Sequence, residues 1–176
     1  AVEENDHPIT DGLHLGEDVR GQEDGAVLRQ AADQPAILLI HGGPTSHIPA
    51  MYSADTSFFT SRGYACLAVN YRGSTGFGRT YRNALRGRWG DLDVMDSVSG
   101  ARALVDRGLA DPSRLVIKGG SAGGYTVLNC LIRNPGFFRA GICLYGVTNL
   151  FALNEVTHKF ESRYLDSMVG RLPEDR

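Results

Sequence analysis

A serine stands at a glycine-rich turn between a short apolar run that begins at Arg114 and a helical pattern that ends at Asn134. The turn, Gly119-Gly-Ser-Ala-Gly123, has the G-x-S-x-G pattern of a nucleophile elbow, which lies between a strand and a helix. The turn is tight, and glycines beside the serine avoid the clash that a Cβ would cause. The segment predicts Ser121 as a nucleophile; the alternative is a glycine-rich turn with a bystander serine.

Strand and helix patterns alternate from Pro35 onward. Continuous apolar runs are typical of strands covered on both faces, and they occupy residues 36–40, 65–69, 115–117 and 140–145. Helical patterns occupy residues 53–62, 91–107, 122–134 and 149–170. This alternation predicts an α/β fold in which helices cover both faces of a mostly parallel sheet. Ligands of such sheets bind beyond the carboxyl ends of the strands.

A nucleophilic serine needs a base for its proton and N–H donors for the oxyanion that forms when it attacks a carbonyl. The backbone N–H of Ala122, the residue after the serine, is the first expected donor. The second donor should come from the loop after an earlier strand, where His41-Gly-Gly-Pro44 stands. We expect the N–H of Gly43 to serve, because glycine lets a backbone amide turn inward.

Several other residues at this edge have two interpretations each. His41 is either the catalytic base or an anchor of its loop. We favour the anchor, because in α/β sheets with a nucleophile elbow the catalytic histidine follows the serine in the sequence. Arg72 either binds a substrate carboxylate or carbonyl, or pairs with a carboxylate that braces its loop. Tyr125 and Val147 either wall a side-chain pocket or pack in the core.

Composition favours one soluble globular domain with an acidic lead-in. The chain has 176 residues, of which 42% are hydrophobic, and a net charge of −2. Nine acidic residues and two arginines lie in residues 1–34, so this segment carries −7. We expect residues 1–34 to be poorly structured and residues 35–176 to form the domain.

The same composition argues against several classes of partner and cofactor. The net charge gives no sign of a nucleic-acid or membrane partner, and no apolar stretch approaches the length of a membrane span. No Cys or His cluster suggests a metal, and no cofactor is expected. Three cysteines in apolar segments, Cys66, Cys130 and Cys143, predict buried free thiols and a reducing, cytoplasmic location.

From about residue 36 to 170 the chain resembles the catalytic domain of the prolyl oligopeptidase family (S9) of serine peptidases, in its acylaminoacyl-peptidase and dipeptidyl-aminopeptidase branch. The motifs that carry the resemblance are His41-Gly-Gly-Pro-Thr-Ser46, Asn70-Tyr-Arg-Gly-Ser-Thr-Gly-Phe-Gly78, Gly87-Arg-Trp-Gly-Asp91, Gly119-Gly-Ser-Ala-Gly-Gly-Tyr125 and Thr157-His-Lys-Phe-Glu-Ser-Arg-Tyr164. The resemblance implies an α/β-hydrolase fold, Ser121 as the nucleophile, Gly43 and Ala122 as oxyanion donors, and peptide or acyl-peptide substrates.

Two departures from the family qualify that expectation. Members usually carry a β-propeller before the hydrolase domain. Their catalytic acid and histidine each follow a later strand, and these strands have no counterpart among the strands predicted up to Arg176. We therefore expect an incomplete sheet whose exposed apolar edge favours association. Glu155 and His158 follow Ser121 in the right order, but positions three apart on one helix seldom allow both triad roles. The alternatives are a truncated, non-catalytic fragment or pseudoenzyme, and a carboxylesterase with the same elbow.

Overall fold

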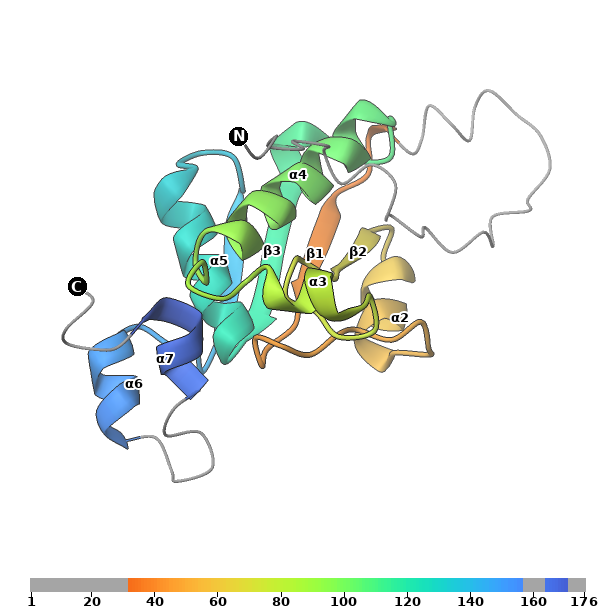
Figure 1. Ribbon diagram of the computed structural model, residues 1–176. Coiled ribbons are helices and arrows are strands. Elements are labelled where there is room, and N and C mark those ends of the chain that lie inside the picture. The colour runs from red at the N-terminus through yellow and green to blue at the C-terminus, as the bar shows by residue number, and fades with distance from the viewer. Residues whose placement is uncertain (1–31, 157–163, 171–176) are drawn as a thin grey trace, which may run out of the picture.

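The computed structural model describes residues 32–156 and 164–170 (Figure 1). The strands are β1 (Ala36–Ile40), β2 (Ala65–Val69), β3 (Leu115–Gly120) and β4 (Ala140–Leu144). The helices are α2 (Ala54–Thr60), α3 (Arg79–Asn83), α4 (Leu92–Asp106), α5 (Ala122–Arg133), α6 (Leu150–Val156) and α7 (Tyr164–Val169). A 3₁₀ turn at Pro112–Arg114 leads into β3. The acidic segment expected to be poorly structured lies almost wholly outside the described residues.

The four strands form one parallel sheet in the order β2-β1-β3-β4. Ile40 at the end of β1 lies opposite Val69 of β2 and Gly119 of β3, so these three strands end at nearly the same level. The chain leaves β1 toward β2 on one side and reaches β3 on the other side. The strand order thus reverses beside β1, and the loops after β1 and β3 meet at the point where such sheets bind ligands.

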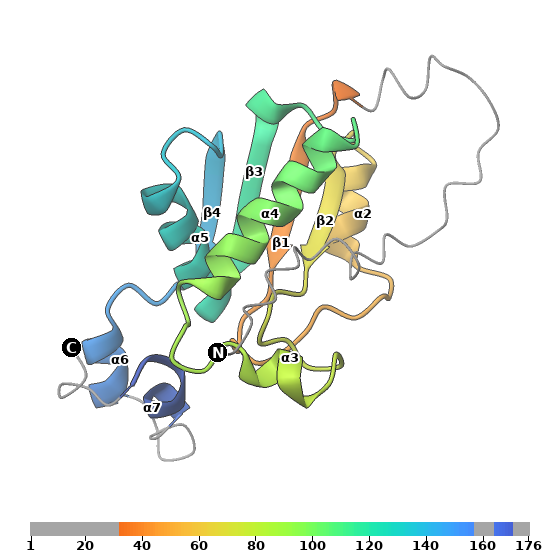
Figure 2. The same cartoon turned by 45° about the horizontal axis from the view of Figure 1, so that its top comes forward.

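Helices cover both faces of the sheet, as the sequence predicted. In Figure 2, α4 crosses in front of the sheet, with α5 in front of β4, while α2 lies behind β2. This division follows from right-handed crossovers, because a connection that reverses its direction along the sheet must also change face. The architecture is that of an α/β-hydrolase sheet, of which the described residues form part.

The core lies between the sheet and its helices. Ala36, Ile37 and Leu38 of β1 are fully buried, as expected for a central strand with both faces covered. On α4, the apolar stripe that includes Val94 and Ala101 is buried against the sheet. No helix among the described residues is long and apolar enough to cross a membrane.

Three sequence-based expectations differ from the structure. Helix α3 was not predicted, because its five residues are too few to show a helical period. Strand β3 continues through Gly120, because both neighbouring strands pair with its glycines. The cysteines are not uniformly buried: Cys130 is buried, Cys66 is partly exposed and Cys143 is exposed.

The exposure of Cys143 reflects the position of β4 at the edge of the sheet. Among the described residues β4 pairs only with β3, and four of its five residues are exposed. Leu144 and the following Tyr145 are 42% and 83% exposed. This edge has the apolar character expected from the sequence, and association through it stays a prediction.

Candidate active site

Ser121 lies at the turn that joins β3 to α5 and is exposed to solvent. Its backbone has φ 54° and ψ −122°, a conformation that residues with a Cβ rarely adopt and that costs about 1–3 kcal/mol. The Ser121 N–H donates to the carbonyl of Leu144 at 3.0 Å, and the Ser121 carbonyl accepts from the N–H of Tyr125 at 3.2 Å. These bonds hold the serine in the strained geometry of an elbow.

The glycines around the elbow allow backbone segments to approach closely. A Cβ on Gly119 would lie 2.5 Å from the carbonyl oxygen of Gly123. A Cβ on Gly123 would collide with the carbonyl oxygens of Ile40 and His41. The first turn of α5 therefore sits directly on the end of β1, and only glycine fits between them.

The loop after β1 lies against this elbow. A Cβ built on Gly42 would be 3.5 Å from the Cβ of Ser121 and 3.8 Å from the backbone nitrogen of Ala122. Gly43 has φ +122° and precedes Pro44 through a cis peptide bond. Within residues 32–156 and 164–170, no hydrogen-bond acceptor is found for the backbone N–H of Gly43 or Ala122. Gly42, the residue before Gly43, thus lies beside the serine, and the part of the Gly43 and Ala122 N–H groups as oxyanion donors stays a prediction.

The His41 side chain is held by contacts within the loop after β1 and with the loop after β2. Its Nδ1 lies 2.8 Å from the carbonyl oxygen of Gly42, which can only accept, so Nδ1 carries a proton. Its Nε2 lies 2.7 Å from Oγ of Ser74, and its ring stacks on Tyr71. Burial lowers the pKa of His41, and the Ser74 hydroxyl donates to the carbonyl of Tyr71 at 2.7 Å. Both ring nitrogens are engaged, as the anchor interpretation requires.

Arg72 is committed to a carboxylate from α4. Its Nε and Nη2 donate to Oδ1 of Asp96 at 3.0 and 2.7 Å, and its backbone N–H donates to Oδ2 at 2.7 Å. The Asp96 side chain is 4% exposed and that of Arg72 is 31% exposed. These contacts agree with the bracing interpretation, whereas a role for Arg72 in substrate binding stays a prediction.

Tyr125 and Val147 lie beside the elbow and are both partly buried. The Tyr125 ring packs on Trp89, with centroids 4.7 Å apart, and a Cβ on Gly90 would lie 2.9 Å from it. The Val147 N–H points to the Ser121 carbonyl at 3.4 Å. Both residues therefore pack locally around the serine, and their proposed part in a substrate pocket stays a prediction. The buried indole N–H of Trp89 has no partner among the described residues.

A buried carboxylate that the sequence analysis missed fixes α4 to α5. Asp93 is fully buried and accepts from Oγ1 of Thr126 at 2.5 Å and from the Gly90 N–H at 2.7 Å. Burial raises the pKa of Asp93 despite these donors. The signal available was the presence of Asp93 and Asp96 within an otherwise apolar helical stripe, where a charge needs a partner.

A catalytic base is not found among the described residues. Their two histidines are His41, which is engaged as above, and His47, whose Nδ1 lies 2.9 Å from Oγ1 of Thr75. None of the described side chains hydrogen-bonds to Oγ of Ser121. His158 and the side chain of Glu155 lie outside the described residues. Over the part of the chain that is described, no group of three His, Cys, Asp or Glu side chains could hold a metal.

Comparison with known proteins agrees with this geometry. The sequence profile of the Prolyl oligopeptidase family matches residues 50–175. Dipeptidyl aminopeptidase BIII of Pseudoxanthomonas mexicana is 33% identical over 145 residues, which cover 82% of this chain and 21% of that protein. Dipeptidyl peptidase family member 6 of Caenorhabditis elegans is 40% identical over 126 residues, which cover 70% of this chain and 17% of that protein.

Solved structures give the same result. A puromycin-hydrolyzing peptidase of Mycobacterium tuberculosis superposes with a TM-score of 0.77 at 46% identity, over 80% of this chain and 21% of that one. An acylaminoacyl peptidase of Pyrococcus horikoshii superposes with a TM-score of 0.74 at 26% identity, over 82% of this chain and 24% of that one. The chain thus spans about a fifth of the length of the relatives it matches.

Proposed function

Because the chain belongs to the prolyl oligopeptidase family of serine peptidases, we propose that Ser121 is the nucleophile in the hydrolysis of peptide or acyl-peptide bonds. The observation that carries this proposal is the backbone of Ser121, held at φ 54° where β3 turns into α5. Strain of this kind persists only where surrounding contacts maintain it, and it presents the hydroxyl at the carboxyl edge of the sheet.

In this proposal the serine Oγ gives its proton to a base and attacks the acyl carbon; the C–N bond then breaks, the amine leaves with that proton, and water hydrolyses the resulting ester. The carbonyl oxygen becomes an oxyanion and accepts hydrogen bonds from the N–H groups of Gly43 and Ala122. The approach of Gly42 to Ser121, and the lack of an acceptor for the Gly43 and Ala122 N–H groups among the described residues, support this assignment. Losing one such donor typically costs about 3–4 kcal/mol of transition-state stabilisation.

The base that takes the Ser121 proton is proposed to be a histidine outside the described residues, oriented by a carboxylate. In resembling peptidases both groups follow the serine in the sequence. Without them, oxyanion and binding effects alone leave only residual catalysis. This leaves open the alternative that the 176-residue chain by itself is non-catalytic.

The substrate class is proposed from the names of the relatives, among them dipeptidyl aminopeptidases and acylaminoacyl peptidases. Arg72, Tyr125 and Val147 are proposed to contact the substrate; Asp96 already engages Nε and Nη2 of Arg72, so any contact of its guanidinium with substrate would use Nη1. A carboxylesterase would use the same elbow and donors. A cytoplasmic location is proposed as well.

The test compares turnover of an acyl-peptide anilide and of a short ester by the wild-type chain and S121A, with and without added imidazole as an external base. The matched control is S99A, because Ser99 is an exposed serine of α4. We expect anilide hydrolysis that depends on Ser121 and that imidazole accelerates if the chain lacks its own base. Hydrolysis of the ester alone favours the esterase, and no Ser121-dependent turnover of either substrate favours the non-catalytic alternative.

A further inference from the structure

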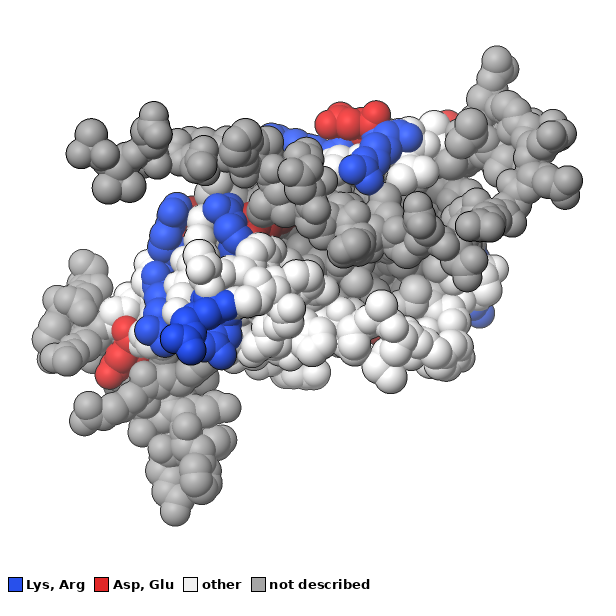
Figure 3. Space-filling view, turned by 45° about the vertical axis from the view of Figure 1, so that its right-hand side comes forward, with Lys and Arg blue, Asp and Glu red and all other residues white. Residues whose placement is uncertain are grey.

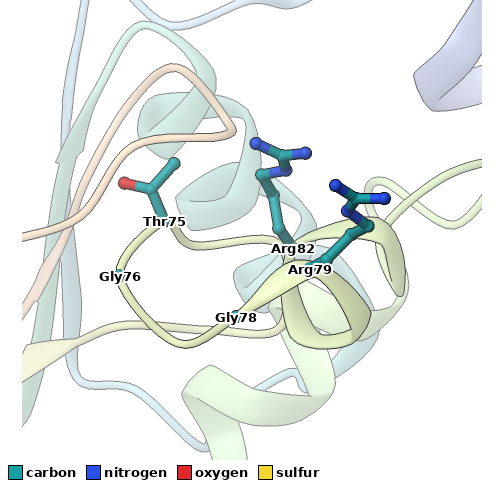
Figure 4. Close-up of a pocket in the computed structure, with 5 residues that line it drawn as sticks. All are labelled: Thr75, Gly76, Gly78, Arg79 and Arg82. Carbon is teal, nitrogen blue, oxygen red and sulfur yellow. The ribbon is translucent and has the colours of Figure 1, made fainter.

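A cavity of about 290 Å³ lies where the loop after β2 enters α3. It is lined by Thr75, Gly76, Gly78, Arg79 and Arg82. Figure 4 shows the side chains of Arg79 and Arg82 extending in the same direction from α3. Two guanidinium groups therefore border one cavity. The two glycines line it with backbone atoms alone.

The arginines at this cavity have no carboxylate partner among the described residues. In the part of the chain that is described, neither Arg79 nor Arg82 has a carboxylate within 4 Å, and the same holds for the neighbouring Arg86. By contrast, Arg72 and Arg88 each pair with an aspartate. Figure 3 shows a face of the molecule on which Lys and Arg side chains gather. Arginines without internal partners at a cavity are free to bind an external anion.

The cavity is connected to the loop that carries the candidate oxyanion donor. The Thr75 N–H donates to the carbonyl of Ser46 at 2.8 Å, and Thr75 Oγ1 lies 2.9 Å from Nδ1 of His47. Ser46 and His47 belong to the loop after β1, shortly beyond Gly43. Since β1 and β2 are adjacent and parallel, both loops lie at the carboxyl edge of the sheet, the edge that presents Ser121.

We propose that Arg79 and Arg82 form a subsite for a carboxylate of a peptide bound at this edge. The inference rests on the proposed peptide substrate and adds a preference for acidic peptides. A guanidinium presents paired N–H donors that match the two oxygens of a carboxylate. In a peptide that group is the C-terminal carboxylate or the side chain of Asp or Glu.

The test measures binding rather than turnover. Three fluorescein-labelled peptides share one neutral sequence: the first has a free C-terminal carboxylate, the second is amidated, and the third is amidated with one internal Glu. Their affinities for S121A, which prevents cleavage, are measured by fluorescence anisotropy. The comparison is repeated with R79Q/R82Q in the same background. The matched control is R107Q, which removes an exposed arginine at the far end of α4.

We expect a carboxylate peptide to bind about three- to tenfold more tightly than the amide, as two partly exposed ion pairs allow. The preference should vanish in R79Q/R82Q, persist in R107Q and weaken as salt is raised. Which peptide shows the preference identifies the terminal or the side-chain carboxylate. Equal affinity for all three peptides, an unchanged preference in R79Q/R82Q, or no binding of any peptide at millimolar concentration overturns the subsite.

Further measurements keep this result interpretable. The single variants R79Q and R82Q should each lose part of the preference, which guards against misfolding of the double variant. Turnover in the anilide and ester assay tests Ser121 independently of the arginines. A carboxylate preference without Ser121-dependent turnover would support the subsite and contradict the proposed hydrolysis. Ser121-dependent turnover without a carboxylate preference would support the hydrolysis and contradict the subsite.

Discussion

The imidazole of His41 stacks on the phenol ring of Tyr71, with centroids 4.3 Å apart and planes inclined by 15°. The Tyr71 hydroxyl donates to the carbonyl of Pro44 at 2.9 Å, across the Gly42-Gly43 turn from His41. Tyr71 comes directly from the loop after β2, so the two rings join two loops at one edge of the sheet. The turn that contains Gly43 is therefore held by a buried pair, because His41 precedes it and Tyr71 donates to Pro44 at its end.

Replacing Tyr71 with Phe should lower the free energy of unfolding by about 1–3 kcal/mol, because it leaves the buried carbonyl of Pro44 without its donor. Urea unfolding followed by circular dichroism measures this change. Y52F is the matched control, since the Tyr52 side chain is 81% exposed. Equal stability of Y71F and wild type would show that the Tyr71 hydroxyl does not support the loop.

The stability of the chain should fall with acidification in a way that depends on His41. Burial lowers the pKa of His41 in the folded chain below its ordinary value of 6.5. Between the two pKa values the unfolded chain therefore binds more protons at His41 than the folded chain does. This contribution is lost progressively as the pH falls below 6.5 toward the lowered value. Burial raises the pKa of Asp93 and of Asp96, so their contributions have the opposite sign.

Urea unfolding of wild type and H41Q between about pH 5 and pH 8 separates these effects, because the carboxylates are common to both proteins. The difference in stability between wild type and H41Q should shrink as the pH falls. A difference that stays constant over this range would mean that His41 is as easily protonated in the folded chain as in the unfolded one.

Substituting Ser121 with Gly should stabilise the chain more than substituting it with Ala. At φ 54° and ψ −122°, alanine keeps the strained Cβ, whereas glycine adopts this conformation freely. After the entropy cost of glycine, S121G should exceed S121A by about 1 kcal/mol in unfolding free energy. If S121A is equally or more stable, the elbow stores no such strain.

Removing Arg72 distinguishes its two interpretations. If the guanidinium braces the loop, R72Q should lose about 1–3 kcal/mol of stability, because the buried carboxyl of Asp96 loses its main hydrogen-bond partner. If Arg72 mainly binds substrate, R72Q should weaken peptide affinity while the unfolding midpoint stays near that of the wild type. R107Q is the control for loss of one exposed arginine.

Sequence patterns were most informative where the physics is local. The continuous apolar run at 36–40 and the glycines around Ser121 predicted a central strand and an elbow, since buried strands and tight turns constrain composition directly. Helix α3 was not predicted because its five residues are stabilised by tertiary contacts. One of these is the hydrogen bond that the Tyr81 hydroxyl donates to the carbonyl of Asn70 at 2.7 Å.

The partners of the candidate site residues could not be predicted from local patterns. Chain order suggested that His41 was an anchor, but its partners Tyr71 and Ser74 lie about 30 residues further along the chain, and only folding brings them together. The choice between the two interpretations of Arg72 likewise depended on Asp96, which stands on another element. No local pattern reports such a pairing.

Mapping the adduct of a fluorophosphonate probe by tandem mass spectrometry tests the central claim most directly. The probe is attacked by an activated serine through an oxyanion-like transition state, so it reports the nucleophile and its N–H donors together. The proposal predicts an adduct on Ser121 in strong preference to the other serines of the chain, absent from S121A and faster when imidazole is added. An adduct spread over several serines, or none on Ser121 even with imidazole, would contradict it.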